Sequence, residues 1–313
     1  MPEKVVITGG SGFIGSHLAE ELLKLDFEVV VFDNFSTGNI DNLKEAKQLV
    51  KVVKGDIRNY QEIEKAVSGA TFVFHLAALS YVGESIKIPE SYNQVNIDGT
   101  LNVLKACRSN SVEKFIFPST CIVYGNPSKS PTSENEPLNA HTPYGFTKVA
   151  GEFYSKFFYE VHGLQTICLR IFNAYGPRMR QRVINKFADL MLENKPPVIN
   201  GNGEQKRDFI FVSDIVDGFV KAMKAKKMLA GKSFNIGTGE STNLKELVEK
   251  INYSLGTNIP IQFQKEVSGE TDEIIADVTL AEKELGFSSK VGLDNGLKIT
   301  MQWLKNDHKN RKK

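Results

Sequence analysis

Short apolar runs alternate with longer amphipathic runs along the first half of the chain. Residues 4–8 are rich in β-branched side chains, the run from His17 to Leu25 is amphipathic, and residues 28–33 are again apolar. Short apolar runs bounded by turn residues predict buried strands, and apolar positions three and four residues apart predict helices. Further strands are expected at 49–53, 71–76, 114–118 and 165–170, and further helices at 60–67, 89–110 and 143–161. The pattern predicts a doubly wound α/β fold with a parallel sheet.

The alternation becomes less regular after Phe172. Helices are expected at 183–193, 213–224, 243–255, 279–285 and 293–304, and short strands at 198–199, 208–212 and 234–236. We see no internal repeat and no flexible linker. We therefore expect a sheet domain at 1–171 that takes back a segment at about 208–236. A smaller α/β domain, formed by 172–207 and 237–313, is expected to pack over it with a ligand cleft between the two.

A glycine-rich loop joins the first predicted strand to the first predicted helix. It reads Gly9-Gly10-Ser11-Gly12-Phe13-Ile14-Gly15, and the second strand ends in Asp33. In this context the glycines allow a tight turn and let a pyrophosphate approach the backbone, while free N–H groups of the helix bind the phosphates. A carboxylate at Asp33 accepts hydrogen bonds from the adenosine ribose hydroxyls and repels a 2′-phosphate. The unit therefore predicts a dinucleotide site that prefers NAD to NADP.

The segment that begins at Thr142 holds a candidate acid–base pair. Pro143 suits the first turn of a helix, which places Tyr144 and Lys148 on one face. An ammonium beside a phenol lowers the pKa of the tyrosine, and the phenolate can then act as a general base. The same spacing is also ordinary on exposed helices that carry no chemistry. The helix is apolar on more than one face, so either internal packing or a second subunit covers its outer side.

Composition narrows the classes of function. The net charge of +2 argues against binding nucleic acid or a membrane surface through bulk electrostatics. There is no 18-residue apolar run and no leader-like start, so we expect a cytoplasmic protein. The three cysteines indicate no disulfide framework, and the five histidines lack metal-ligand spacing, so no metal is expected.

Several ordered motifs carry a resemblance to a known family. They are Thr8–Gly15, His75–Ala78, Asn96–Thr100, Tyr144 with Lys148, Arg170–Arg178, Arg207–Asp214 and Asn235–Gly237. Over nearly its whole length the chain resembles the extended short-chain dehydrogenase/reductase family, and it looks most like the UDP-sugar 4-epimerases. The resemblance implies an NAD-binding Rossmann domain and a smaller nucleotide-sugar-binding domain.

The resemblance also implies roles for individual residues. Thr120, Tyr144 and Lys148 match the catalytic residues. The residues implied to hold NAD are Gly9, Gly12, Phe13, Ile14, Gly15, Asp33, Asn34, Asp56, Ile57, Leu76, Ala77, Ala78, Asn96 and Lys148. Those implied to contact the UDP-sugar are Thr120, Tyr144, Asn173, Arg207 and Ile274. The implied reaction is inversion at C4 through a 4-keto intermediate, by a homodimer joined through the helices that carry Asn96 and Tyr144.

Two departures bear on the substrate. Dehydratases of the family carry an Asp-Glu pair directly after the threonine, where this chain has Cys121-Ile122, so dehydration is disfavoured. The usual Arg-Pro-Gly-Asp/Glu motif reads Val267-Ser268-Gly269-Glu270, so a phosphate-binding arginine is absent. The candidates to replace it are Lys265, Arg178, Arg180 and Arg182.

The choice of sugar stays open among family members. The segment Val82-Gly83-Glu84-Ser85 is more similar to the UDP-galactose 4-epimerase pattern than to that of the uronate epimerases. Ile274 is intermediate between the tyrosine that excludes N-acetyl groups and the smaller residues that admit them, which favours acceptance of both sugar types. The alternatives are a UDP-glucuronate 4-epimerase, a dehydratase and a non-catalytic NAD-binding scaffold.

Overall fold

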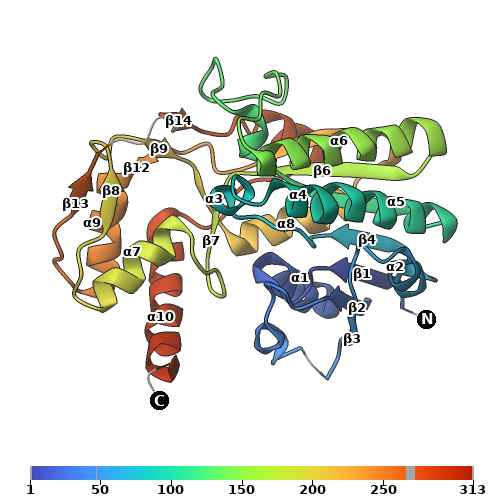
Figure 1. The fold of residues 1–313 in the computed structure, drawn as a ribbon, viewed down its shortest axis with the longest axis horizontal. Helices are drawn as coiled ribbons and strands as arrows, with labels where there is room; N and C mark the ends of the chain where they lie inside the picture. Colours follow the sequence, from blue (N-terminus) through green and yellow to red (C-terminus); the bar gives the residue numbers. More distant parts are fainter. Residues whose placement is uncertain (1, 47, 266–271, 312–313) are drawn as a thin grey trace.

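The computed structural model describes residues 2–46, 48–265 and 272–311, and its centre is a seven-stranded parallel sheet (Figure 1). In order across the sheet the strands are β11 (Ser233–Ile236), β6 (Gln165–Ile171), β5 (Lys114–Thr120), β4 (Phe72–His75), β1 (Lys4–Thr8), β2 (Glu28–Asp33) and β3 (Lys51–Lys54). The strand order reverses direction between β1 and β4, as in doubly wound sheets. The predicted fold class is confirmed.

Helices cover both faces of this sheet because successive strand residues point to opposite sides. Val5 and Ile7 belong to one apolar cluster and Val6 to the other. The first cluster is completed by α1 (Phe13–Lys24) and α8 (Val212–Lys224). The second is completed by α2 (Tyr60–Val67), α5 (Gly99–Ser109) and α6 (Pro143–His162). The expected strands and helices of the first half are present, with small shifts at their ends.

The long helix expected at 89–110 contains a change of winding. It consists of α4 (Pro89–Asn93), a π turn η2 (Gln94–Asp98) and α5 in direct succession. A π turn takes one extra residue per hydrogen-bonded ring and is frequent at functional sites. Here it turns Asn96 into the interior, where its side chain is buried.

The remaining described residues form three small sheets and a helical layer. The sheets pair β7 (Asn173–Tyr175) with β10 (Phe209–Phe211), β8 (Val198–Asn200) with β13 (Gln262–Gln264), and β9 (Lys206–Arg207) with β12 (Thr242–Asn243) and β14 (Glu273–Ile274). The helices α7 (Val183–Leu192), α9 (Leu244–Leu255) and α10 (Leu293–Arg311) pack around a cluster of their own, beside the main sheet in Figure 1. The strand expected at 208–212 is present as the shorter β10, and Asp208 separates it from the two-residue strand β9, which was not expected.

Short elements complete the structure. They are η1 (Ile40–Leu43), α3 (Val82–Ser85), η3 (Cys121–Tyr124), η4 (Lys227–Leu229) and the π turn η5 (Ala281–Leu285). The polar segment between η3 and α6 is irregular, as expected, and is tied down by a bridge between Thr132 and Ala276. Within the ranges that the structure describes, we find no helix long and apolar enough to cross a bilayer.

Candidate active site

The glycine loop lies tightly against the segment that follows β4. Gly9 has a φ of +70°, and a Cβ atom placed there would stand 2.6 Å from the backbone nitrogen of Ala77. A Cβ at Gly15 would stand 2.5 Å from the carbonyl oxygen of Gly9. Only glycine fits both places, so β1, α1 and the alanines after β4 can meet here. Between them the buried Ser11 hydroxyl has no hydrogen-bond partner among the described residues, which fits a phosphate-bearing ligand.

Asp33 is held in place at the carboxyl end of β2. One of its carboxylate oxygens accepts from Ser11 N at 3.0 Å and the other from Phe35 N at 2.8 Å. A carboxylate oxygen can accept more than one hydrogen bond, so both retain capacity for ribose hydroxyls. The glycine loop and the carboxylate thus form one surface that fits the dinucleotide predicted from sequence.

Asp56 sits in a small charged cluster after β3. Arg58 binds its two carboxylate oxygens at 3.0 and 2.7 Å, and the amide of Asn34 donates to it at 2.9 Å. The hydrogen bond from Arg58 is the main reason why the pKa of the Asp56 carboxyl lies well below its usual range. Ile57 follows, and its carbonyl oxygen accepts from Asn102 at 3.1 Å. Asn34, Asp56 and Ile57 are therefore brought together as expected, and Arg58 is an unpredicted partner.

Tyr144 is buried in the first turn of α6. The helix begins as predicted, with the Thr142 hydroxyl accepting from Gly145 N at 3.2 Å and Pro143 in the first turn. The side chain of Thr120, at the end of β5, lies close enough to the Tyr144 side chain to lower the pKa of the phenol by hydrogen bonding. The ring of Tyr92 packs edge-on against the Tyr144 ring, with centroids 6.4 Å apart. The candidate tyrosine and threonine are in contact.

Lys148 lies one helical turn after Tyr144 and reaches the end of β5. Its ammonium donates to the carbonyl oxygen of Pro118 at 2.8 Å and lies 4.7 Å from the centroid of the Phe117 ring. Burial lowers the pKa of Lys148 to about 8. The ammonium is thus a buried and oriented group close to the end of a central strand.

The expectation that Lys148 lowers the pKa of Tyr144 is wrong for this structure. Burial is the largest influence, and it raises the pKa of Tyr144 above the ordinary value. The positive charge that opposes this rise belongs to Arg182, and the hydrogen bond from Thr120 acts in the same direction. The physical reason is that the ammonium of Lys148 is directed at Pro118, while both side chains are removed from water.

Asn96 connects the segment after β4 with α6. Its amide nitrogen donates to Leu79 O at 2.9 Å and to the Thr147 hydroxyl at 3.0 Å, and its amide oxygen accepts from Leu79 N at 2.9 Å. The preceding residues Leu76 and Ala77 are held by Thr8, through backbone and hydroxyl contacts at 2.9 and 3.2 Å. The supporting position expected for Asn96 is therefore filled by a fully hydrogen-bonded amide.

The residues expected at the sugar end belong to the small sheets, and one of them packs against η3. Ile274 is buried in one cluster with Cys121 and Ala276. In the β9–β14 pairing it stands opposite Arg207, whose guanidinium donates to Lys206 O at 2.9 Å. Asn173 donates to Asp208 O at 3.1 Å. These residues belong to the small sheets, whereas Asp33 ends β2 and Asp56 follows the edge strand β3 of the main sheet.

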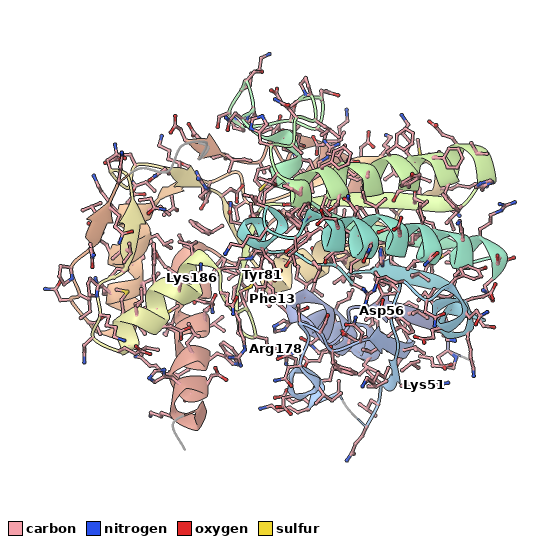
Figure 2. All side chains as sticks on the ribbon, in the orientation of Figure 1. Phe13, Lys51, Asp56, Tyr81, Arg178 and Lys186 are labelled. Atoms are coloured by element: carbon pink, nitrogen blue, oxygen red, sulfur yellow. The ribbon has the colours of Figure 1, made fainter. Side chains whose placement is uncertain are left out.

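The candidate phosphate-binding cations have different partners. Arg178 forms an ion pair with Glu20 of α1. Arg180 forms one with Asp307 at 3.3 Å and lies over the Trp303 ring. Arg182 donates to Ser80 O at 2.8 Å and lies over the Tyr81 ring, 5.4 Å from its centroid. Figure 2 shows Phe13, Tyr81 and Arg178 where the main sheet meets the smaller sheets. The segment 267–270 lies outside the described residues.

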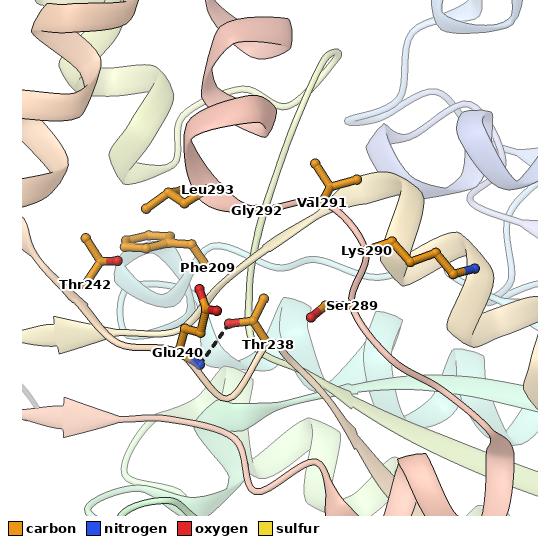
Figure 3. Close-up of a pocket in the computed structure, with 9 residues that line it drawn as sticks. All are labelled: Phe209, Thr238, Glu240, Thr242, Ser289, Lys290, Val291, Gly292 and Leu293. Atoms are coloured by element: carbon orange, nitrogen blue, oxygen red, sulfur yellow. Dashed lines mark hydrogen bonds between the residues drawn. The ribbon is translucent and has the colours of Figure 1, made fainter.

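A pocket of about 230 Å³ lies elsewhere, between β10 and the loop before α10 (Figure 3). It is lined by Phe209, Thr238, Glu240, Thr242, Ser289, Lys290, Val291, Gly292 and Leu293. The Thr238 hydroxyl donates to Asp208 at 2.7 Å and accepts from Glu240 N at 3.1 Å. The lining contains no predicted site residue, so this pocket is not the candidate active site. Among the residues with described positions, no cluster of metal-binding side chains is found.

The fold and site together define a class of protein, in which a doubly wound dinucleotide-type sheet carries a buried tyrosine beside a threonine and a lysine. The family model described as GDP-mannose 4,6 dehydratase matches residues 6–300, and the chain belongs to this family. The resemblance to extended short-chain dehydrogenases/reductases, and within them to UDP-sugar 4-epimerases, is confirmed.

Three solved structures show how close the likeness is. The UDP-N-acetylglucosamine 4-epimerase of Methanobrevibacter ruminantium, in complex with UDP-N-acetylmuramic acid, is 34% identical with a TM-score of 0.93, over 98% of this chain and 100% of that one. The UDP-glucose 4-epimerase of Thermotoga maritima, with UDP-glucose, is 33% identical with a TM-score of 0.93, over 97% and 99%. The UDP-glucuronic acid 4-epimerase of Bacillus cereus, with UDP-glucuronic acid and NAD, is 32% identical with a TM-score of 0.92, over 97% and 99%.

Sequence reasoning missed the part that Tyr92, Tyr81 and Arg182 play around the loop after β4 and Tyr144. Tyr92 stands four residues before Asn96, and the same helical spacing that related Tyr144 to Lys148 could have related these two. Tyr81 and Arg182 come from loops, where no periodic pattern places a side chain. Arg182 was named only as a candidate phosphate-binding residue, and nothing in the sequence separates it from Arg178 and Arg180.

Proposed function

We propose that this chain is an NAD-dependent UDP-sugar 4-epimerase that inverts C4 of a UDP-hexose through a 4-keto intermediate. The substrates are UDP-glucose and UDP-galactose, their N-acetylated counterparts, or both pairs. The observation that carries the proposal is the buried Tyr144 phenol, which lies beside Thr120 and one helical turn from Lys148. The three solved epimerases above, which match nearly the whole chain, support it.

The residues present fit NAD. Gly9 and Gly15 make the close turn, the Ser11 hydroxyl is buried without a partner among the described residues, and Asp33 keeps lone pairs for the ribose. Lys148, fixed by Pro118, would hold the nicotinamide ribose. When bound, NAD supplies a reversible acceptor for the hydride at sugar C4.

The proton is handled by two side chains of the protein. Thr120 hydrogen-bonds the C4 hydroxyl and passes its proton toward the phenol oxygen of Tyr144, which later returns it. Because burial raises the pKa of Tyr144, the base is mostly protonated at low pH, and we expect kcat/KM to rise with pH on the acid side. The UDP group would be anchored by Asn173 and Arg207, away from the reacting ring, so that the keto sugar can turn over.

The matching family model is described as a dehydratase, so dehydration is the second reaction to consider. It needs an acid–base group next to the threonine, and the position after Thr120 holds Cys121. Burial raises the pKa of the Cys121 thiol to about 12, so it stays neutral and cannot take up the proton that must be removed. This favours epimerisation. A UDP-glucuronate 4-epimerase remains the alternative, and it needs a cation that faces C6 of the sugar.

Two further parts of the proposal concern organisation. The main sheet with the return segment at about 208–236 would form the NAD-binding domain, and 172–207 with 237–313 the nucleotide-sugar domain.

We also propose a homodimer through α5 and α6, supported by an exposed apolar stripe on α6 that consists of Phe146, Phe153, Phe157 and Val161. A cytoplasmic location is supported by the cysteines, which are all buried and unpaired.

The test is turnover across a panel of UDP-sugars with and without N-acetyl and carboxylate groups, for the wild type and Tyr144→Phe. We expect C4 epimerisation of UDP-glucose or UDP-N-acetylglucosamine, and a loss of at least about a thousandfold in Tyr144→Phe with NAD binding retained. Normal epimerisation by Tyr144→Phe would refute the role of the phenol. Loss of water from the sugar, seen by mass, would establish the dehydratase, and no turnover on any sugar would establish the scaffold.

A further inference from the structure

Residues 176–182, which we call the arginine strap, bind three separate elements. Arg178 pairs with Glu20 of α1, and Arg180 pairs with Asp307 and covers Trp303 of α10. Arg182 binds the loop after β4 through Ser80 and Tyr81. Arg178 and Gln181 have positive φ angles of 70° and 59°, which side-chain-bearing residues seldom adopt. The strap is therefore held by its contacts rather than by local preference.

The loop that Arg182 binds is fixed at three consecutive residues by three side chains. Asn96 holds both backbone groups of Leu79, at 2.9 Å each. Arg182 holds the carbonyl oxygen of Ser80. The hydroxyl of Tyr92 contacts both backbone groups of Tyr81, at 3.0 and 2.7 Å. We call residues 79–81 the clamped loop.

Asn96 and Tyr92, which also hold the clamped loop, contact the catalytic helix α6 directly. Asn96 donates to Thr147, the neighbour of Lys148, at 3.0 Å. The ring of Tyr92 packs against the ring of Tyr144 at an interplanar angle of 83°. The position of the clamped loop is therefore coupled to the position of the phenol. Arg182 differs from these two because it lies 102 residues further along the chain than Ser80, in the part that would bind the sugar.

Arg178 and Arg180 are each paired with a carboxylate in the described structure, and Arg182 differs from them in this respect. Both neighbours are paired with carboxylates, whereas the hydrogen-bond partner of Arg182 is a neutral carbonyl and, within the described ranges, no carboxylate is ion-paired with it. A positive charge without an adjacent anion acts at longer range in a buried site.

We propose that Arg182 is a positioning residue for Tyr144, which fixes the clamped loop against α6 and brings a positive charge toward the phenol. This inference rests on the proposed function. It predicts that the ionisation of Tyr144 depends on how the arginine strap, and with it the sugar-binding part, packs against the clamped loop.

The groups around Tyr144 allow the effect of the Arg182 charge to be measured apart from that of other ionisable side chains. In the described structure, the ionisable side chains whose charge bears on the phenol are Arg182, Cys121 of η3 and Tyr92 of α4. Lys148 is directed at Pro118, and Glu84 of α3 meets the phenol only through Tyr92, to which it is bonded at 2.9 Å. Cys121 and Tyr92 both have pKa values raised by burial, so they stay neutral near pH 7. Arg182 is then the group whose removal should change the ionisation of Tyr144.

The experiment compares Arg182→Gln and Arg182→Lys with Arg180→Gln, a matched loss of charge on the same strap. Phenol ionisation is followed by ultraviolet difference absorbance, with Tyr144→Phe subtracted, and kcat/KM is measured against pH. We expect Arg182→Gln to shift both the Tyr144 ionisation and the acid limb upward by about one pH unit, with about a tenfold loss of kcat/KM at pH 7. Arg182→Lys should recover most of the shift, and Arg180→Gln should show none.

Several results would overturn the proposal. One is an unchanged Tyr144 ionisation in Arg182→Gln. Another is a change confined to KM for sugars that carry a carboxylate, which would make Arg182 a reader of substrate charge. A third is a pH shift of equal size in Arg180→Gln. The absorbance titration needs no turnover, so a wild type that epimerises no UDP-sugar would refute the proposed function while still testing Arg182.

Discussion

Tyr144 lies where burial and neighbouring groups act in opposite directions on one proton. Burial raises the pKa of the phenol, while Arg182 and Thr120 lower it. A base of this kind needs its pKa near the working pH, because it must both take and return a proton. The helical pattern predicts that Lys148 lowers the pKa of Tyr144. In the structure the positive charge that does so belongs to Arg182, which lies in a distant loop.

Asp33 decides which dinucleotide is accepted, if its carboxylate holds the ribose as proposed. We expect Asp33→Ala to weaken NAD binding by roughly ten- to a hundredfold, since a hydrogen bond to a charged group is worth about 1.5–3 kcal/mol. NADP binding should be unchanged or stronger, because the repulsion of the 2′-phosphate is removed. Both affinities can be measured by calorimetry.

Asp41→Ala, on η1 in the same N-terminal region, is a suitable control for general effects of removing a charge. Asp33 also accepts from Ser11 and Phe35, so the unfolding temperature should be followed in parallel. An unchanged ratio of NAD to NADP affinity in Asp33→Ala would contradict the role given to this carboxylate.

At the scale of elements, α6 is placed by a close contact with β5. Gly151 lies on α6 over Phe117, and a Cβ there would stand 2.2 Å from the ring. The same ring lies beneath the Lys148 ammonium. The absence of one side chain thus sets the distance between the catalytic helix and the strand that ends in Thr120.

We expect Gly151→Ala to destabilise the fold by about 1–3 kcal/mol, although alanine gains about 1 kcal/mol over glycine in an open helix. Phe117 is buried and has no room to move, so α6 must shift and Lys148 with it. Urea unfolding and kcat both report this. Gly83→Ala on α3 is the control, because a Cβ there meets nothing within 4 Å. If Gly151→Ala is as stable as Gly83→Ala, close packing does not position the helix.

The elements that sequence could predict are those whose periodicity reflects one-sided or complete burial. The strands at 4–8 and 28–33 and the helix at 60–67 match the observed β1, β2 and α2 in their bounds. The π turn at 94–98 was not predictable, because its residues continue the apolar pattern of the flanking helices. The break between β9 and β10 depends on Asp208, whose carboxylate binds Thr238, Gly239 and Ala276 far along the chain.

The candidate site was predictable to the extent that it is local. Tyr144, Lys148, Thr120 and the glycine loop were located from spacing and resemblance, because each lies on a regular element or directly between two of them. The clamp by Arg182 depends on a strap with two positive φ angles, and the direction of the Lys148 ammonium depends on a carbonyl thirty residues earlier. Contacts of this kind arise from the tertiary structure and leave no periodic trace in the sequence.

At the scale of the whole molecule, the outer face of α6 decides whether the chain acts alone. Phe153 is 65% exposed there, in the stripe with Phe146, Phe157 and Val161 that no described part of the chain covers. If a second copy covers it, Phe153→Asp buries a charge in the interface, and the protein should become monomeric at micromolar concentration in analytical ultracentrifugation. Tyr253→Asp on α9, which is 91% exposed and far from α6 in Figure 1, should leave the mass unchanged. A wild type that is already monomeric would refute the dimer.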